Sequence, residues 1–153
     1  MNTIRRFAKS LREFLVPSKP AEPEVPLQAI NLTRGTMLAT HLVVASSGET
    51  RRKGLLGRDS LLPGEGLWIK PCESVHTFFM RFPIDLVYLD RKHRVKKVTS
   101  SVPPWRLSAC LSAYSIVELP AGTIHRTQTE KGDVLEFSQV SAPDFQNSTL
   151  EPA

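Results

Sequence analysis

The chain of 153 residues is 41% hydrophobic and 23% charged, the composition of one globular domain, and two cysteines are too few for a disulfide framework. The net charge of +5 is concentrated in residues 1–19, where five basic residues accompany one acidic residue, so the remaining chain carries only +1. A nearly neutral domain argues against nucleic-acid binding, because such binding needs a basic face. The two cysteines are expected to be reduced thiols, which indicates a reducing compartment.

The N-terminal stretch TIRRFAKSLREFLV has apolar residues at the spacing of one helical face, which predicts an amphipathic basic helix over residues 1–16. Charges recur through Glu13, so the pattern predicts neither a signal peptide nor a transmembrane span. The helix either packs on protein or lies on an anionic membrane. We therefore expect a cytoplasmic protein, with peripheral contact to the inner membrane as an option. Membrane contact would involve Arg5, Arg6, Phe7, Lys9, Leu11 and Arg12.

Four prolines then recur at every third residue from Pro17 to Pro26. Polyproline II has three residues per turn, so this spacing indicates an extended spacer. The sequence after Pro143 is polar and is expected to fray. The predicted divisions are a helix at 1–16, a Pro-rich linker at 17–30, a β domain at 31–140 and a flexible tail at 141–153.

The central part of the chain consists of short β-branched and apolar runs separated by Gly, Pro and Asp turns. One short helix is expected between a cap at Ser46 or Ser47 and an end at Gly57. The pattern predicts a mainly β fold, a compact antiparallel sandwich or barrel of about seven short strands with that one helix. Strands are expected at 36–44, 67–69, 73–80, 84–89, 95–99, 114–119 and 134–137.

Five motifs occur in a fixed order: RRKGLLGRDSLLPGEGLWI, HTFFMRFPIDLVYLD, VPPW, VELPAG and KGD. Together they resemble the domain of unknown function 192 family over residues 36–138. The resemblance implies a compact, mostly β domain with one short helix that carries an Arg-x-x-Gly-Leu element, and it implies no established activity. Many relatives begin with a signal peptide, and this chain departs from them there, so an exported location does not carry over.

Asp85 is the most informative polar residue, because an acidic group in a buried strand is costly unless it is paired or hydrogen-bonded. Its expected partners are an arginine (Arg58, Arg81 or Arg106) or backbone N–H groups near Gly57 or Gly122. The residue either holds a junction of the fold or belongs to a polar pocket for a sugar-like or carboxylate ligand. That predicted ligand-binding set is Asp85, His76, Arg58, Trp105 and Met80.

Cys72, His76 and Met80 are spaced by four, and their side chains suit Cu(I). Four residues of strand span about 13 Å, so the three side chains would not reach one ion without a bend, and the same distance argues against Cys72 and His76 as a nucleophile–base pair. The chain also lacks a GxSxG elbow. We therefore predict no metal, no cofactor and no catalytic residue.

The leading interpretation is a non-enzymatic accessory domain that binds a small molecule or a protein partner, and not nucleic acid. The alternative is a hydrolase or carbohydrate-processing enzyme that uses Asp85 and His76. A third possibility is a scaffold that only displays the tail and has no pocket. A catalytic pair needs both side chains in one open cleft, whereas a structural Asp85 would be buried and bonded to backbone.

Overall fold

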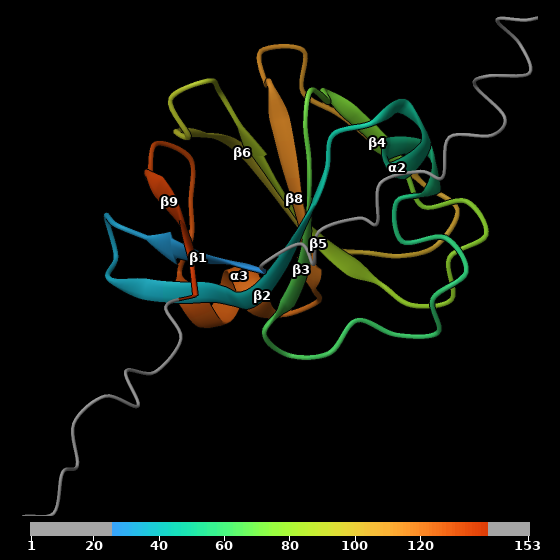
Figure 1. Ribbon diagram of the computed structural model, residues 1–153, viewed down its shortest axis with the longest axis horizontal. Coiled ribbons are helices and arrows are strands. Elements are labelled where there is room, and N and C mark those ends of the chain that lie inside the picture. The colour runs from blue at the N-terminus through green and yellow to red at the C-terminus, as the bar shows by residue number, and fades with distance from the viewer. Residues whose placement is uncertain (1–25, 141–153) are drawn as a thin grey trace, which may run out of the picture.

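The computed structural model describes residues 26–140, in which nine strands and two short helices form a mainly β domain (Figure 1). The fold class predicted from the sequence is confirmed. The elements are β1 (Leu27–Asn31), β2 (Thr36–Ala45), α2 (Gly48–Lys53), β3 (Glu65–Ile69), β4 (Ser74–His76), β5 (Ile84–Leu89), β6 (Val95–Val102), β7 (Leu107–Ala109), β8 (Ser115–Pro120), α3 (Thr123–Thr127) and β9 (Leu135–Gln139).

Seven strands form one sheet in the order β6-β5-β8-β3-β2-β1-β9, and β4 pairs with β7 in a separate small sheet. Every pairing is antiparallel except that of β2 with β3. The large sheet curls so far that its ends meet at a bridge between Arg94 and Val134. The backbone N–H of Val95 also donates to the carbonyl of Asp133 at 2.8 Å. Of the two predicted architectures, the structure is therefore closer to the barrel.

The curled sheet separates two hydrophobic cores, because successive side chains of a strand point to opposite faces. On one face, Val87 of β5 and Val117 of β8 pack in the core inside the curl, which Ile124 of α3 helps to close. On the other face, Leu86 and Ile116 belong to the outer core. All six residues of β5 are buried, as expected for a strand covered on both faces.

The outer core is covered by the connection from β2 to β3 and by the small sheet. Parallel strands cannot be joined by a tight turn, so residues 46–64 must cross over the sheet, and they carry α2 with them. Figure 1 shows α2 and β4 together at one side of the molecule, away from α3. This crossover positions the candidate site. Within the described residues, neither helix has the length and apolar character needed to cross a bilayer.

Several predicted boundaries differ from the structure. Residues 27–30, expected in the linker, begin β1, which pairs with both β2 and β9, so the domain starts before residue 31. The expected strand at 73–80 is reduced to β4, which ends at His76, and the chain leaves the β region at Phe79, whose φ is 64°. The prediction that Gly57 ends the helix is wrong: α2 ends at Lys53, with Gly54 as its cap.

Three predicted segments lie wholly or partly outside the described residues. They are the helix at 1–16 with its membrane-contact residues, the linker up to residue 25, and the tail at 141–153. The cap predicted at Ser47 is confirmed, since its side chain accepts a hydrogen bond from the Thr50 backbone N–H at 3.1 Å. The Lys-rich strand β6 is an edge strand of the large sheet, a position where lysines discourage pairing with another chain.

Candidate functional site

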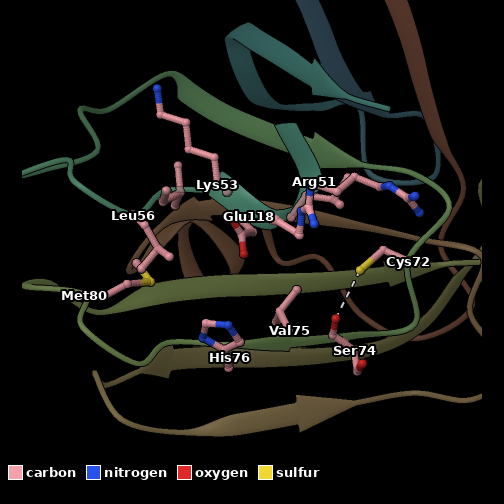
Figure 2. Close-up of a pocket in the computed structure, with 13 residues that line it drawn as sticks. Arg51, Lys53, Leu56, Cys72, Ser74, Val75, His76, Met80 and Glu118 are labelled. Atoms are coloured by element: carbon pink, nitrogen blue, oxygen red, sulfur yellow. Dashed lines mark hydrogen bonds between the residues drawn. The ribbon is translucent and has the colours of Figure 1, made fainter. Parts of the chain in front are cut away.

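A cavity of about 460 Å³ lies on the outer face of the large sheet, between α2, β4 and the middle of β8 (Figure 2). This volume falls in the range of pockets that hold small ligands. Its wall combines apolar side chains with basic, sulfur-containing and acidic groups. The lining residues are Arg51, Arg52, Lys53, Gly54, Leu55, Leu56, Ile69, Cys72, Ser74, Val75, His76, Met80 and Glu118.

Glu118 is the acidic group of this cavity, and it comes from β8, which lies between β5 and β3 in the large sheet. The residue is only 4% exposed, and its Oε2 atom has no hydrogen-bond partner. In Figure 2 the carboxyl lies between Arg51 of α2 and the β4 residues Val75 and His76. A buried polar atom without a partner is unfavourable, so its position beside a cavity marks it as a group that a ligand would satisfy.

Burial raises the pKa of Glu118 to about 7. At neutral pH the carboxyl is therefore divided between its neutral and ionised forms, and it both accepts and donates hydrogen bonds. A carboxyl of this kind suits a ligand hydroxyl or amino group. Its pKa is also in the range that general acid–base chemistry uses.

Helix α2 places positive charge at the rim of the cavity, because Arg51, Arg52 and Lys53 follow one another in its last turn. Arg51 Nη1 donates to the Pro71 carbonyl at 2.9 Å, and Arg52 Nε donates to the Gly48 carbonyl at 3.1 Å. The Lys53 side chain points away from Glu118 in Figure 2. The two guanidinium groups are therefore the cations available to an anionic ligand.

Cys72 and Met80 are the sulfur-containing residues of the cavity wall. Cys72 donates its Sγ–H to the Ser74 carbonyl at 3.1 Å, and burial is the main cause that raises the pKa of its thiol. A raised thiol pKa disfavours the nucleophilic thiolate. Cys72 and Met80 lie at opposite ends of the cavity (Figure 2). Among residues 26–140, no three His, Cys, Asp or Glu side chains converge as metal ligands would.

Asp85 lies outside this cavity and serves the fold. It is 0% exposed, and its Oδ1 accepts from the Ser101 backbone N–H at 2.7 Å while its Oδ2 accepts from the Ile124 backbone N–H at 2.8 Å. It thus joins β5 to β6 and to the start of α3. This arrangement corresponds to the structural role that was one of the two roles expected for Asp85. Backbone N–H groups near Gly122 were among its expected partners. The enzyme interpretation needed Asp85 in an open cleft, and the structure does not place it there.

The predicted ligand-binding set is only partly brought together. His76 and Met80 line the cavity, whereas Arg58 interacts with Glu65 at 3.4 Å and Trp105 lies on an exposed loop. Trp105 does not line the cavity. Its ring packs near Phe78, and the ring of Phe78 stacks on His76, which does line it. The expected pocket of Asp85, His76, Arg58 and Trp105 is therefore not assembled.

Glu118 is the residue that the sequence interpretation missed. The signal was present, because Glu118 interrupts the apolar run of the strand expected at 114–119 in the same way that Asp85 interrupts its own strand. The cost of burying a charge applies equally to both. Arg51 and Arg52 could not be recognised, because a basic helix face is usually only solvated.

The chain is similar to a family without an established activity. The DUF192 family model, described as an uncharacterized ACR, matches residues 29–137. A UPF0127 protein of Thermococcus gammatolerans is 30% identical over 114 residues, which are 71% of this chain and 73% of that protein. The UPF0127 protein of Pyrococcus furiosus is 31% identical over 117 residues, which are 72% of this chain and 98% of that protein.

Two crystal structures share the fold. One is a Sinorhizobium meliloti protein described provisionally as a transcription regulator, with a TM-score of 0.63 and 20% identity, over 72% of this chain and 91% of that chain. The other is a protein of unknown function from Novosphingobium aromaticivorans, with a TM-score of 0.62 and 18% identity, over 79% of this chain and 94% of that chain. At these identities the likeness concerns the fold alone.

Proposed function

The chain belongs to the DUF192 family, and we propose that its domain is a non-enzymatic module that binds a small organic acid in the cavity around Glu118. One observation carries this proposal. A carboxyl oxygen that is buried, without a hydrogen-bond partner and beside a cavity is left unsatisfied by the fold itself. A ligand that donates a hydrogen bond to it would remove that cost on binding.

The chemistry of the ligand follows from what surrounds Glu118. A hydroxyl or amino group would meet the carboxyl, and a carboxylate or phosphate would meet the guanidinium groups of Arg51 and Arg52. The apolar wall, which includes Ile69 and Val75, would contact the carbon skeleton. The proposed class is therefore small hydroxy acids, amino acids and sugar phosphates.

A second candidate is an enzyme that uses Glu118 as a general acid or base. One observation favours it, namely the pKa of about 7. His76, which lines the same cavity, would be the second titratable group. In this candidate, Glu118 takes the catalytic role that the hydrolase alternative gave to Asp85. Both oxygens of Asp85 already accept hydrogen bonds from backbone N–H groups.

The test is a calorimetric titration of the full chain with hydroxy acids, amino acids and sugar phosphates, each beside its uncharged analogue. We expect binding of an anionic compound that weakens at least tenfold in Glu118→Gln and in Arg51→Gln. Glu136→Gln and Arg126→Gln, which change exposed residues away from the cavity, are the matched controls. The proposal is wrong if no compound binds at millimolar concentration, or if binding is indifferent to both cavity variants.

Recovery of the ligand separates the two candidates. A binding module returns the compound unchanged after prolonged incubation, as NMR would show. An enzyme would convert it, and the conversion would depend on Glu118.

The membrane role of the N-terminal stretch remains a proposal from sequence, since its residues lie outside the described part of the chain. It rests on the charge of +4 in residues 1–19 and on the helical spacing of the apolar residues. Deletion of residues 1–16 should weaken sedimentation with anionic vesicles at low salt. Sedimentation that is equal for the deleted and the full chain would contradict this role.

A further inference from the structure

Two adjacent loops at one end of the small sheet expose large apolar side chains to solvent. Phe79 is 71% exposed, Trp105 is 55% exposed, and Leu107, at the start of β7, is 74% exposed. The rings of Phe79 and Trp105 contact each other edge to face, with centroids 4.7 Å apart and planes at 61°. We call these three residues the apolar tip.

The tip is held in place by Thr77, which is buried beneath it. The Thr77 backbone N–H donates to the Arg106 carbonyl at 2.9 Å, and the Trp105 N–H donates to the Thr77 carbonyl at 3.0 Å. The Thr77 hydroxyl donates to the Pro103 carbonyl at 2.7 Å and accepts from the Arg106 N–H at 2.9 Å. Four hydrogen bonds thus fasten the two loops to each other, so the exposed rings project from a fixed base.

The backbone at the tip is unfavourable for the residues found there. Phe79 and Trp105 both have positive φ, 64° and 65°, a conformation that bulky side chains rarely adopt and that Asn or Gly adopts readily. Their rings are also exposed to water. Neither local conformation nor burial in the described fold therefore accounts for a phenylalanine and a tryptophan at these positions, and this points to a role outside the fold.

Positive charge lies beside the tip and along the neighbouring β5–β6 hairpin. Arg106 follows Trp105, whereas Arg81 pairs with Asp59, and residues 91–117 contain six basic residues and no acidic residue. Most of that charge lies in the turn before β6 and in the first half of β6, at the opposite end of the strand from the loop that carries Trp105. Lys97 of β6 donates to the Ala109 carbonyl of β7 at 3.0 Å, so the basic strand runs next to the small sheet that carries the tip.

We infer that the apolar tip is a contact surface for an anionic phospholipid bilayer. Aromatic side chains favour the interface between headgroups and acyl chains, and Arg106 beside Trp105 would meet a phosphate. Basic residues along β6 add long-range attraction to the anionic surface. The edge-to-face contact of Phe79 with Trp105 leaves no pair of parallel ring faces on which nucleotide bases would stack.

The test uses the full chain and vesicles of phosphatidylcholine with 30% phosphatidylserine, beside vesicles of phosphatidylcholine alone. The tip variant carries Phe79→Asn and Trp105→Asn, because Asn tolerates positive φ and so preserves the fold. The matched control carries Leu32→Asn and Leu62→Asn, two exposed leucines elsewhere on the domain. We expect the tip variant to lose sedimentation with anionic vesicles at least tenfold and the control to retain it. Circular dichroism checks that all three proteins are equally folded.

A second readout reports on the tip itself. The only other tryptophan of the chain, Trp68, is buried, so a change in emission on adding vesicles reports Trp105. We expect a shift to shorter wavelength and quenching by brominated lipid, also after deletion of residues 1–16. Unchanged emission overturns the inference even if the N-terminal stretch binds lipid, and so does equal sedimentation of the tip variant and wild type when both lack residues 1–16. An emission change with a single-stranded oligonucleotide but not with vesicles would equally overturn it.

Discussion

Asp85 and Glu118 lie on neighbouring antiparallel strands, and their side chains point to opposite faces of the same sheet. The register pairs Asp85 with Leu119 and Leu86 with Glu118, and directly paired residues share a face. Asp85 is on the inner face, where two backbone N–H groups satisfy it, and Glu118 is on the outer face, where one oxygen is unsatisfied. Two buried carboxyl groups at adjacent positions thus have separable roles, one in stability and one at the cavity.

Glu118 should make the protein less stable as the pH rises. Its pKa is near 4.5 when unfolded and about 7 when folded, so the folded state binds the extra proton between these values. The contribution of Glu118 to stability is therefore greatest below pH 4.5 and is lost as the pH rises to about 7, which amounts to about 3 to 4 kcal/mol at about 1.4 kcal/mol per pKa unit. Urea denaturation of wild type and Glu118→Gln from pH 4.5 to 8 would measure this. Parallel curves for the two proteins would contradict the assignment.

Asp85→Asn should destabilise the fold without altering the cavity. The amide would turn an N–H₂ group toward one of two backbone donors, which leaves that donor buried and without an acceptor. We expect a loss of about 2–4 kcal/mol in the free energy of unfolding, measured by urea denaturation. Ligand affinity of the folded variant should equal that of wild type. A stable variant that loses ligand binding would instead place Asp85 in the site.

Cys72 should react slowly with alkylating reagents, and a ligand should slow it further. Burial raises the pKa of its thiol, so little thiolate is present at pH 7, and the residue lines the Glu118 cavity. Cys110 does not line this cavity and provides the internal comparison. Mass spectrometry of iodoacetamide-treated protein would resolve the two sites. Ligand that protects both cysteines equally would argue against binding in the cavity.

Gly66→Ala should disturb the packing between the two cores. An added Cβ would lie 2.8 Å from Leu42 Cδ1 and 3.2 Å from the backbone oxygen of Glu118. Overpacking of this kind costs about 1–3 kcal/mol, which thermal denaturation would show as a lower midpoint. Gly48→Ala is the matched control, since its Cβ meets nothing within 4 Å and alanine favours a helix. Equal midpoints for the two variants would contradict this account.

The sequence predicted secondary structure best where the local residue pattern agrees with the place of the element in the fold. The apolar run Ile84–Leu89 indicates a strand buried on both faces, and Ser47 is a recognisable helix cap; both are as predicted. The strand β1 and the helix α3 are too short for their own pattern, and long-range pairing and contact with β2 and β6 stabilise them. The position of the candidate site likewise depends on tertiary structure. Asp85 and Glu118 look equivalent in sequence, and only the register of β5 and β8 separates their environments.

The crossover from β2 to β3 has a consequence for how such domains diversify. The strands of the curled sheet are held by pairing and by two cores, whereas residues 46–64 are held mainly through Leu55 and Leu61 and a short capped helix. Insertions, deletions and changes of charge in that segment would remodel the rim of the cavity and leave strand register untouched. The shape and charge of the cavity rim can therefore change by exchange of a single loop.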